Sequence, residues 1–289
     1  MERRHPLNQS QLYRVTTRSK LAHIFGLTEK GLQELLTLPR PFTSRDIEIT
    51  RNGVTKIRHV QEPRSKLRPI HNRARKLLSR IEPPDFLFCP VKGRSYVNNA
   101  ALHAGAREIR TLDVAKYFPS TPRHRVYWFF HKVMLCNSDV ASILAQLLTA
   151  DAHLATGSTV SPILSFYAFR DMWLKIADIA HTAGCTISVY MDDVTVSGET
   201  VPELVMWKIR QQVHSRGLTY HKERHFKNGV GEVTGVIVRD GKTVLPNRQR
   251  KKVHDLRNAL RQTVDPDEIA AIKRSLTGLT SQQKQVESR

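Results

Sequence analysis

The sequence predicts a mixed α/β fold in which helices alternate with short strands. Two patterns support this prediction. Apolar residues recur at helical spacing in several segments, as in residues 162–183, whereas residues 185–198 alternate apolar and polar side chains as half-buried strands do. A chain of 289 residues is also long enough for two or three subdomains around one main core. We find no internal repeat and no low-complexity tract.

The N-terminal third is expected to begin with helices and continue into a hairpin. Residues 1–45 carry apolar side chains at the spacing of amphipathic helices, interrupted by glycine and proline. Residues 46–70 predict a β-hairpin that turns at Asn52-Gly53, a dipeptide that favours two-residue turns. Residues 73–81 then predict a basic helix, which a pair of prolines ends.

The remaining elements follow from the same two periods. The apolar run at the start of residues 109–118 predicts a short buried strand. Thr200 and Glu203 match a capping box, which predicts a helix that runs to about Ser215. Further helices are expected at residues 125–135, 138–149, 162–183 and from 265 onward.

The acidic segment at residues 190–193, Tyr-Met-Asp-Asp, joins the two strands of the second predicted hairpin. Asp192 and Asp193 would therefore lie at its tip. Adjacent carboxylates repel each other, and a tight turn gives them no obvious partner. A divalent cation would remove the repulsion, since Mg²⁺ binds through one or two carboxylates plus substrate phosphates. An isolated Asp-Asp pair is more simply explained as a solvent-facing turn, so this interpretation depends on the rest of the chain.

A third carboxylate, Asp113, follows the apolar run of the strand predicted in residues 109–118. The end of that strand is expected beside the acidic hairpin. Two acidic strand ends that meet are typical of a two-metal site for phosphoryl transfer, in which one ion activates an attacking 3′-hydroxyl and the other stabilises the leaving pyrophosphate. Taken alone, Asp113 is equally compatible with a helix cap or a salt-bridge partner.

The charge balance indicates a polyanionic partner. The chain has 46 Lys+Arg against 26 Asp+Glu, a formal net charge of +20 and a pI near 10.3, which favours nucleic acid or an anionic membrane. Residues 40–80 hold 12 Lys/Arg against 3 Asp/Glu, and residues 239–261 hold 8 against 2. Either block alone would be a solvated face. Because the two blocks flank the predicted acidic site in the sequence, we expect them to form the walls of a cleft that binds the phosphate backbone of a nucleic acid.

Neither a membrane span nor a signal peptide is expected. No stretch approaches the roughly 18 continuous apolar residues of a transmembrane helix, and the N-terminus has no apolar leader. The three cysteines, Cys89, Cys136 and Cys185, are widely spaced, so we expect reduced and mostly buried thiols. The sequence therefore predicts a soluble cytoplasmic protein without a membrane partner.

In their order along the chain, the motifs resemble those of reverse transcriptases, and among these the bacterial retron enzymes. Two segments point to retrons in particular: residues 99–103 match the family's Asn-Ala-x-x-His element, and residues 233–235 read Val-Thr-Gly. The resemblance covers residues 50–262 and also rests on the first acidic motif at residues 112–118, the glycine-centred substrate loop at residues 155–162 and Tyr-Met-Asp-Asp at residues 190–193.

This resemblance implies a right-hand polymerase whose palm is an antiparallel sheet backed by helices. A helical segment would take residues 1–45, fingers and palm residues 46–235, and the thumb residues 236–289. It also implies RNA-directed DNA synthesis from deoxynucleoside triphosphates with two Mg²⁺ ions, or Mn²⁺ in their place. Retron enzymes use a dedicated structured noncoding RNA as template and as source of the priming 2′-hydroxyl. Their product is a short DNA branched from RNA (msDNA), and they act in anti-phage defence with an effector protein.

The resemblance also assigns roles to single positions. Asp113, Asp192 and Asp193 would be catalytic metal ligands, and Val114 would be a further metal-binding position. The ring of Phe118 would close the pocket under the sugar and exclude a ribose 2′-hydroxyl, unless it is ordinary core. The remaining assignments are nucleotide binding for Lys66, Arg68 and Gly157, and RNA binding for Asn99, His103, Val233, Thr234, Gly235, Arg248, Arg250, Lys251 and Lys252.

Several assignments remain open. Thr156 stands where the family usually has Gln, which puts the contacts of the substrate loop in doubt. Arg224 stands where the family has a Lys, and arginine is a poor acid with a pKa above about 12, so no proton donor is assigned, although Lys222 is close by. Asn99 and His103 are equally compatible with a helix start followed by a buried, hydrogen-bonded histidine.

Two other functions fit the same motifs. One is another bacterial reverse transcriptase, of the group II intron or diversity-generating type. The other is an RNA-binding scaffold that restrains a toxic effector, with DNA synthesis as a secondary activity. The three intact carboxylates, Asp113, Asp192 and Asp193, argue against a purely structural role.

Overall fold

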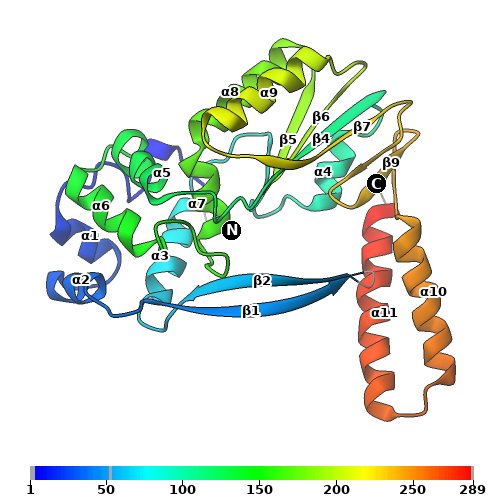
Figure 1. Cartoon of the computed structure of the whole chain (residues 1–289), viewed down its shortest axis with the longest axis horizontal. Coiled ribbons are helices and arrows are strands. Elements are labelled where there is room, and N and C mark those ends of the chain that lie inside the picture. The colour runs from blue at the N-terminus through cyan, green and yellow to red at the C-terminus, as the bar shows by residue number, and fades with distance from the viewer. Residues whose placement is uncertain (1–3, 52–53, 288–289) are drawn as a thin grey trace. The chain divides into compact units, whose positions relative to one another are not determined.

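The structure, a computed structural model, describes residues 4–51 and 54–287. The chain divides into two compact units. The first takes residues up to 85, 114–176 and 211–219, and the second takes residues 86–113, 177–210 and 220 onward. Helices alternate with short strands along the chain, so the predicted mixed α/β fold is confirmed (Figure 1).

The first unit begins with short helices, of which the two α-helices bury one side. Threonine hydroxyls cap two of them: Thr17 accepts a hydrogen bond from the backbone N–H of Lys20, and Thr28 accepts one from Gly31. Leu21 and other leucines on the inner sides are buried, which confirms the amphipathic helices expected in this segment. The elements are η1 (Leu7–Gln9), α1 (Arg18–Ile24) and α2 (Glu29–Leu36).

Strands β1 (Phe42–Arg51) and β2 (Val54–Pro63) form a long antiparallel hairpin (Figure 1). Their register runs from Phe42 opposite Pro63 to Arg51 opposite Val54, so the predicted hairpin is confirmed. Its predicted turn at Asn52 and Gly53 lies outside the described residues. Helix α3 (Arg68–Leu78) follows and begins five residues before the expected start.

The rest of the first unit is helical and encloses an aromatic core. Residues 162–183 do not form the single helix that was expected, because the backbone leaves the helical region at Phe169 (φ −116°, ψ 25°). At this break the buried Phe169 ring stacks on Tyr117, with 6.1 Å between ring centroids, a contact that the apolar pattern does not reveal. The helices are α5 (Arg123–Trp128), which continues as the π-helix η2 (Phe129–Val133), α6 (Ser138–Leu147), α7 (Ser161–Ala168) and the first half of α8 (Arg170–Thr182), which continues into the second unit after residue 176.

A five-stranded sheet with the order β3-β5-β6-β4-β7 forms the centre of the second unit. Strand β6 is antiparallel to both β5 and β4, as expected, but β3 is parallel to β5. The sheet is therefore mixed, and the expectation of an antiparallel sheet is wrong at this edge. The strands are β3 (Leu87–Cys89), β4 (Glu108–Val114), β5 (Thr186–Tyr190), β6 (Asp193–Gly198) and β7 (Tyr220–Phe226).

Helices α4 (Tyr96–Leu102) and α9 (Glu203–Ser215) lie on opposite faces of this sheet (Figure 1). Arg110 of β4 points toward α9, where it binds Glu203. The predicted capping box is wrong, because the helix begins at Glu203 itself and the Glu203 carboxylate binds Arg110 and Arg210 instead. Ion pairing to the sheet thus replaces the local cap.

A small three-stranded sheet and two long helices complete the second unit. The helices α10 (Asn247–Gln262) and α11 (Pro266–Glu287) pack against each other as an antiparallel pair (Figure 1). The strands are β8 (Gly231–Val233), β9 (Val236–Arg239) and β10 (Lys242–Val244). One buried cluster joins them to α4 and to the end of α11: Val97, Ala100, Ile109, Val233, Val236, Val238, Leu245 and Val286.

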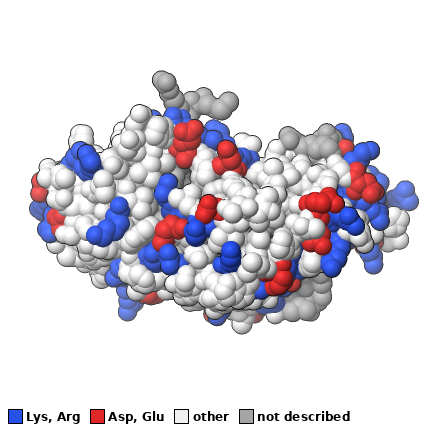
Figure 2. All heavy atoms as spheres, turned by 90° about the horizontal axis from the view of Figure 1, so that it is seen from above, with Lys and Arg blue, Asp and Glu red and all other residues white. Residues whose placement is uncertain are grey.

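On one face of the molecule the positive charge is dispersed. Figure 2 shows Lys and Arg side chains over the visible face with Asp and Glu among them, so on that face the net charge of +20 does not form a single patch. Across residues 4–51 and 54–287, none of the helices has the length and apolar character that crossing a membrane requires.

Candidate active site

The hairpin of β5 and β6 carries the acidic pair at its turn. Tyr190 lies opposite Asp193, which leaves Met191 and Asp192 as the two turn residues. Met191 has a φ of +63°, a left-handed conformation that residues other than glycine adopt mainly in tight turns and constrained sites. The predicted position of Asp192 and Asp193 at the tip of a hairpin is confirmed.

Strand β4 brings the third carboxylate to the same place. Asp113 is the register partner of Asp193 on the neighbouring antiparallel strand. Side chains of such directly opposed residues share one face of the sheet and are close enough to interact. Val114 ends β4 with its side chain fully buried. An aliphatic side chain has no donor atom for a metal, so only the backbone carbonyl of Val114 could act as a ligand.

The opposed carboxylates create an electrostatic conflict. The pKa of Asp193 is raised to about 7, first by burial and then by the negative charges of Asp192 and Asp113, while Arg224 and Lys222 oppose the shift. A bound cation would remove this repulsion, and carboxylate oxygens are the donors that hard divalent ions prefer. Within the described residues, no three His, Cys, Asp or Glu side chains already converge as a metal cluster. The fit therefore rests on Asp113 and Asp193, with Asp192 adjacent on the turn.

A pocket of about 270 Å³ lies over these carboxylates. Its walls combine both signs of charge, because β7 contributes Lys222 and Arg224 opposite Asp113 and Asp193. The turn between β8 and β9 closes another side with Thr234 and Gly235. Such a pocket offers acidic groups for a metal and basic groups for phosphate in one place, and all its lining residues belong to the second unit.

The side chain of Arg224, which lines this pocket, forms an ion pair with the carboxylate of Glu232. Its Nη1 lies 3.6 Å from Oε2 of Glu232, and the guanidinium of Arg248 binds the same carboxylate. These arginines keep the pKa of Glu232 below its usual range, with the hydrogen bond from Arg248 as the largest cause. On β7, His221 Nε2 also lies 3.8 Å from Oδ2 of Asp113. Sequence patterns gave no signal for the role of Glu232, because no helix or strand period pairs it with Arg224 on β7 or with Arg248 on α10.

The residues expected to bind the nucleotide belong to the first unit. Lys66 and Arg68 are exposed where β2 leads into α3. Phe118 is half-buried, with its ring 6.1 Å from that of Tyr117. Tyr117, not Phe118, is the true core residue here, since it is almost fully buried and its hydroxyl accepts a hydrogen bond from Trp173. The role of Phe118 in sugar selection remains a prediction.

Gly157 is required by a close approach of two backbones within the first unit. Its N–H donates to the carbonyl of Gln61 in β2 at 2.8 Å, and a Cβ at this position would lie 2.8 Å from that same carbonyl oxygen and 2.4 Å from Cγ of Glu62. Next to it, the Thr156 hydroxyl donates to the carbonyl of His59 and accepts from the N–H of Gln61. The space that glycine leaves free is thus occupied by β2, while nucleotide binding by Gly157 remains a prediction.

Three of the positions expected to bind RNA are buried. Asn99 and His103 of the α4 region are 1% and 0% exposed, and Val233 is 0% exposed. Their contacts are made inside the second unit, whereas Thr234 and Gly235 are half-buried beside the pocket. As they stand, Asn99, His103 and Val233 offer no side-chain surface to RNA.

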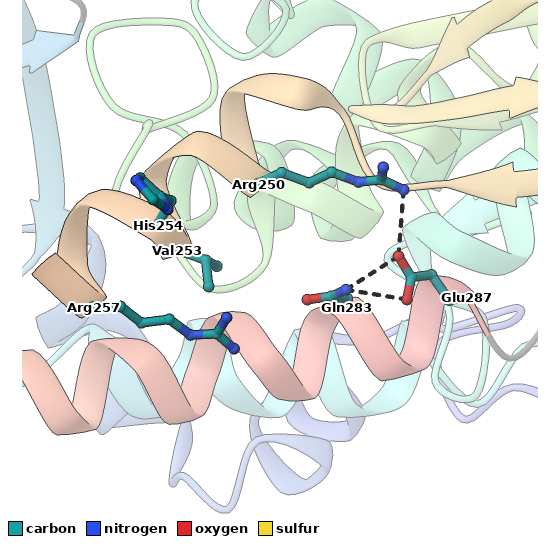
Figure 3. A pocket seen from close by; sticks show the side chains of 6 residues that line it. All are labelled: Arg250, Val253, His254, Arg257, Gln283 and Glu287. Atoms are coloured by element: carbon teal, nitrogen blue, oxygen red, sulfur yellow. Dashed lines mark hydrogen bonds and ion pairs between the residues drawn. The ribbon is translucent and has the colours of Figure 1, made fainter.

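The basic stretch expected to bind RNA forms the first turns of α10. Lys251 and Lys252 are exposed, whereas Arg248 is ion-paired with Glu232 and Arg250 lies 3.5 Å from the carboxylate of Glu287 on α11. Figure 3 shows Arg250 reaching across to Glu287, above a hollow of about 350 Å³ between the two helices. His254 and Arg257 line this hollow too, and successive helical steps of four and then three residues from Arg250 could have identified them.

Comparison with known proteins gives the class of this site. The chain matches no protein-family model. It is 24% identical to the Retron Se72 reverse transcriptase of Salmonella heidelberg, over 84% of this chain and 67% of that protein. It is 24% identical to the Retron Ec86 reverse transcriptase of Escherichia coli, over 76% and 70%. It is 28% identical to the Retron Mx65 reverse transcriptase of Myxococcus xanthus, over 79% and 58%.

These relatives are named reverse transcriptases, which are RNA-directed DNA polymerases, and the paired carboxylates at strand ends of this chain agree with that enzyme class. The chain is thus similar to several retron reverse transcriptases, at 23–28% identity. The resemblance drawn from the sequence motifs is thereby confirmed. Divalent-metal dependence is general to this class and agrees with the carboxylate donors described above.

Proposed function

We propose that this protein copies a dedicated structured noncoding RNA into a short single-stranded DNA that stays branched from the RNA, as retron enzymes do. The observation that carries the proposal is the opposition of Asp113 and Asp193 under a basic wall, in a chain related to retron reverse transcriptases. Acidic and basic groups around one pocket suit a reaction between a nucleic-acid hydroxyl and a nucleoside triphosphate.

Asp113, Asp192 and Asp193 would hold two Mg²⁺ ions, with the carbonyl of Val114 as a further ligand. When bound, these ions would activate the attacking hydroxyl and neutralise the charge of the pyrophosphate that leaves. The carboxylates themselves fix the position of that chemistry at the ends of β4 and β6. Because the raised pKa of Asp193 reflects burial and mutual repulsion, positive charge at this point favours the fully ionised set.

Lys222 and Arg224 would bind phosphate oxygens at the opposite wall of the pocket. Arg224 is restrained by Glu232, so it presents a charge in a defined direction. A guanidinium does not release its proton near neutral pH, which limits Arg224 to electrostatic stabilisation. Lys222 is the better candidate for a proton donor to the leaving group, since an ammonium can give up a proton.

Groups of the first unit would select and hold the incoming nucleotide. The exposed cations Lys66 and Arg68 would bind its triphosphate. The half-buried ring of Phe118 would exclude a 2′-hydroxyl on the sugar. Gly157 would support the adjacent loop through its backbone contact with β2.

We propose a right-hand arrangement for the whole chain. In it, residues 1–45 form an N-terminal segment, residues 46–235 the fingers and palm, and residues 236–289 the thumb. The thumb would grip the RNA with the basic residues of α10, among which Lys251 and Lys252 are exposed. An effector protein would act with the enzyme and its msDNA in defence against phage.

The direct test of this function is to co-express the chain with the RNA encoded immediately upstream of its gene and to isolate the nucleic acid formed. We expect a short DNA that carries RNA through a 2′-linked branch, so that ribonuclease shortens the product without freeing the DNA of its last ribonucleotides. DNA synthesis without this linkage would contradict the retron assignment. An absence of deoxynucleotide incorporation on every primed RNA template would contradict the polymerase assignment.

A further inference from the structure

His103 ties α4 to both strands of the acidic hairpin. It is the C-cap residue of α4 and is fully buried. Its Nδ1 lies 2.7 Å from the hydroxyl of Ser197 on β6, and its Nε2 lies 2.7 Å from the hydroxyl of Ser188 on β5. Burial lowers the pKa of the imidazole to about 3, so the ring is neutral and holds one strand as a donor and the other as an acceptor.

The two serines lie on the same face of the sheet as the carboxylates. Side chains of a strand alternate between faces, so Ser197 shares its face with Thr195 and Asp193 on β6. On β5, Ser188 is the register partner of Thr195. His103 therefore holds the hairpin at a point four residues from Asp193 along β6, on the side where the pocket opens.

Asn99, one turn earlier on α4, holds a different part of the pocket. Its Nδ2 donates to the hydroxyl of Thr234 at 3.4 Å, and that hydroxyl donates to the carbonyl of Tyr96 at 3.0 Å. Because the single proton of the Thr234 hydroxyl is used for Tyr96, the hydroxyl has to accept from Asn99, which fixes the orientation of the amide. Within the described residues Oδ1 of Asn99 is buried without a hydrogen-bond partner, a cost that a fold retains when the position matters.

The segment that Asn99 holds is a constrained turn. Thr234 and Gly235 have φ values of +46° and +81°, so two successive residues adopt the left-handed conformation between β8 and β9. For a β-branched residue such as threonine this conformation is unfavourable and needs support from its surroundings. Both residues line the pocket over Asp113 and Asp193.

Packing makes α4 a rigid link between these two attachments. Val97 and Ala100 of α4 belong to the buried cluster that includes Val233 and Val236 on the strands flanking the turn. The helix thus contacts the five-stranded sheet through His103 and the three-stranded sheet through its apolar side and Asn99.

We infer that Asn99 and His103 are positioning residues: from one helix they hold the carboxylate hairpin and the Thr234-Gly235 turn at a fixed separation across the catalytic pocket. The inference rests on the proposed function, since it takes the carboxylates as the catalytic groups. It explains why two motifs about 130 residues apart, at residues 99–103 and 233–235, occur in one chain: they are two sides of one contact.

The test compares His103→Gln and Asn99→Asp with Leu102→Ala, an exposed position on the same helix. Gln cannot bond both strands as the imidazole does, and Asp lacks the N–H donor that Thr234 needs. We expect kcat for deoxynucleotide incorporation to fall by about 100-fold in either variant, because displacement of a reacting group by about 1 Å has an effect of that order. RNA affinity should stay within about twofold of wild type, and Leu102→Ala should match wild type in both. Loss of RNA affinity with unchanged kcat would overturn the inference in favour of direct RNA contact.

A second readout does not depend on activity. Amide hydrogen exchange should become faster in residues 186–197 for His103→Gln and in residues 232–238 for Asn99→Asp, with α10 and α11 unchanged. If the wild type makes no DNA, the proposed function fails, while the exchange pattern still decides whether α4 holds both segments. Unchanged exchange in both variants would overturn the inference.

A hydroxyl series at residue 234 covers the case in which a buried substitution prevents folding. Thr234→Ser keeps the hydroxyl that Asn99 needs, whereas Thr234→Val removes it at nearly equal volume. We expect Ser to retain kcat and Val to lose it to the extent of Asn99→Asp. The double variant Asn99→Asp with Thr234→Val should be no worse than either single variant, since both remove the same contact. If the losses of kcat in the two single variants added up in the double variant, the Asn99–Thr234 hydrogen bond would not be their common cause.

Discussion

The Asp193 carboxyl is partly buried and faces two other carboxylates, which is why its pKa rises to about 7. Perturbation by burial together with specific charges is typical of functional sites. Lys222 and Arg224 reduce this conflict without removing it. At the level of single residues, the pocket is therefore organised to receive more positive charge than the protein itself supplies.

Phe118 allows a prediction about the choice of sugar. Its ring is half-buried, so part of it is available to a ligand. Phe118→Val should raise kcat/KM for ribonucleotides relative to deoxynucleotides by about tenfold or more, because the smaller side chain no longer clashes with a 2′-hydroxyl. Phe118→Tyr keeps the bulk and should keep the selectivity. Steady-state incorporation of both sugars measures the ratio, and an unchanged ratio in the Val variant would contradict a role of Phe118 in sugar selection.

Strand β7 shows how one element serves both structure and chemistry. Lys222 and Arg224 line the pocket, while Glu223 between them turns to Arg110 of β4 and Arg210 of α9. The Arg110 side chain is 9% exposed and lies 2.6 Å from the Glu223 carboxylate. This buried network sets the position of β7, and with it the basic wall of the pocket.

Removal of Glu223 should therefore be far more costly than removal of Glu203. Glu223→Ala removes the more buried of the two carboxylates that Arg110 and Arg210 share and leaves both arginines with the exposed Glu203 alone, so we expect a loss of about 1.5–3 kcal/mol in the free energy of unfolding. The Glu203 side chain is 65% exposed, so Glu203→Ala should cost less than about 1 kcal/mol. Urea denaturation measures both. Equal losses would show that burial does not govern this network.

In helix α10, mutations can separate the contribution of the lysines to RNA binding from that of the ion-paired arginines. Replacing Arg248, Arg250, Lys251 and Lys252 by Ala should weaken binding of cognate RNA and flatten its salt dependence. The double change Lys251→Ala with Lys252→Ala should reduce the salt slope more than Arg248→Ala with Arg250→Ala, although each removes two charges, because the arginines are already ion-paired. Affinities at several salt concentrations test this. Wild-type affinity and slope in the quadruple variant would exclude α10 as the grip.

Patterns within a short stretch of sequence correctly predicted the strands around the acidic centre. The alternation of apolar and polar residues predicted the β5–β6 hairpin, and the apolar run before Asp113 predicted β4. The acidic centre could therefore be located from sequence. Contacts between segments that are distant along the chain could not be predicted in this way. Phe169, at the helix break, packs on Tyr117, and the buried His103 bonds serines more than 80 positions away. We expected Gly157 to let a nucleotide come close to the backbone, whereas in the structure it is strand β2 that comes close to Gly157.

The whole molecule combines a high positive charge with buried neutral histidines. Each unit contains one: burial lowers the pKa of His71 to about 4 and that of His103 to about 3. In the first unit, His71 bonds the Ser158 hydroxyl and the Leu147 carbonyl. Both rings would bind a proton near pH 6.5 in the unfolded chain and resist it in the folded one.

Stability should therefore fall as the pH is lowered from about 6.5 toward 4, because the unfolded state then binds more protons than the folded state. We expect a loss on the order of 2 kcal/mol per buried histidine at pH 5, partly offset by Asp193, whose raised pKa acts in the opposite direction. His71→Gln should reduce the pH dependence of the melting temperature across this range. A dependence identical to wild type would contradict this origin.

The central claim, that the carboxylates on β4 and at the β5–β6 turn perform metal-dependent DNA synthesis, is tested most directly by Asp192→Asn combined with Asp193→Asn. The measurement is Mg²⁺-dependent incorporation of deoxynucleotides on a primed RNA template, alongside RNA affinity and melting temperature. We predict loss of incorporation by at least about 1000-fold, with RNA affinity and fold retained, since the amides keep the shape of the turn but lack the charge that holds the metal. Undiminished Mg²⁺-dependent incorporation by the folded double variant would contradict the claim.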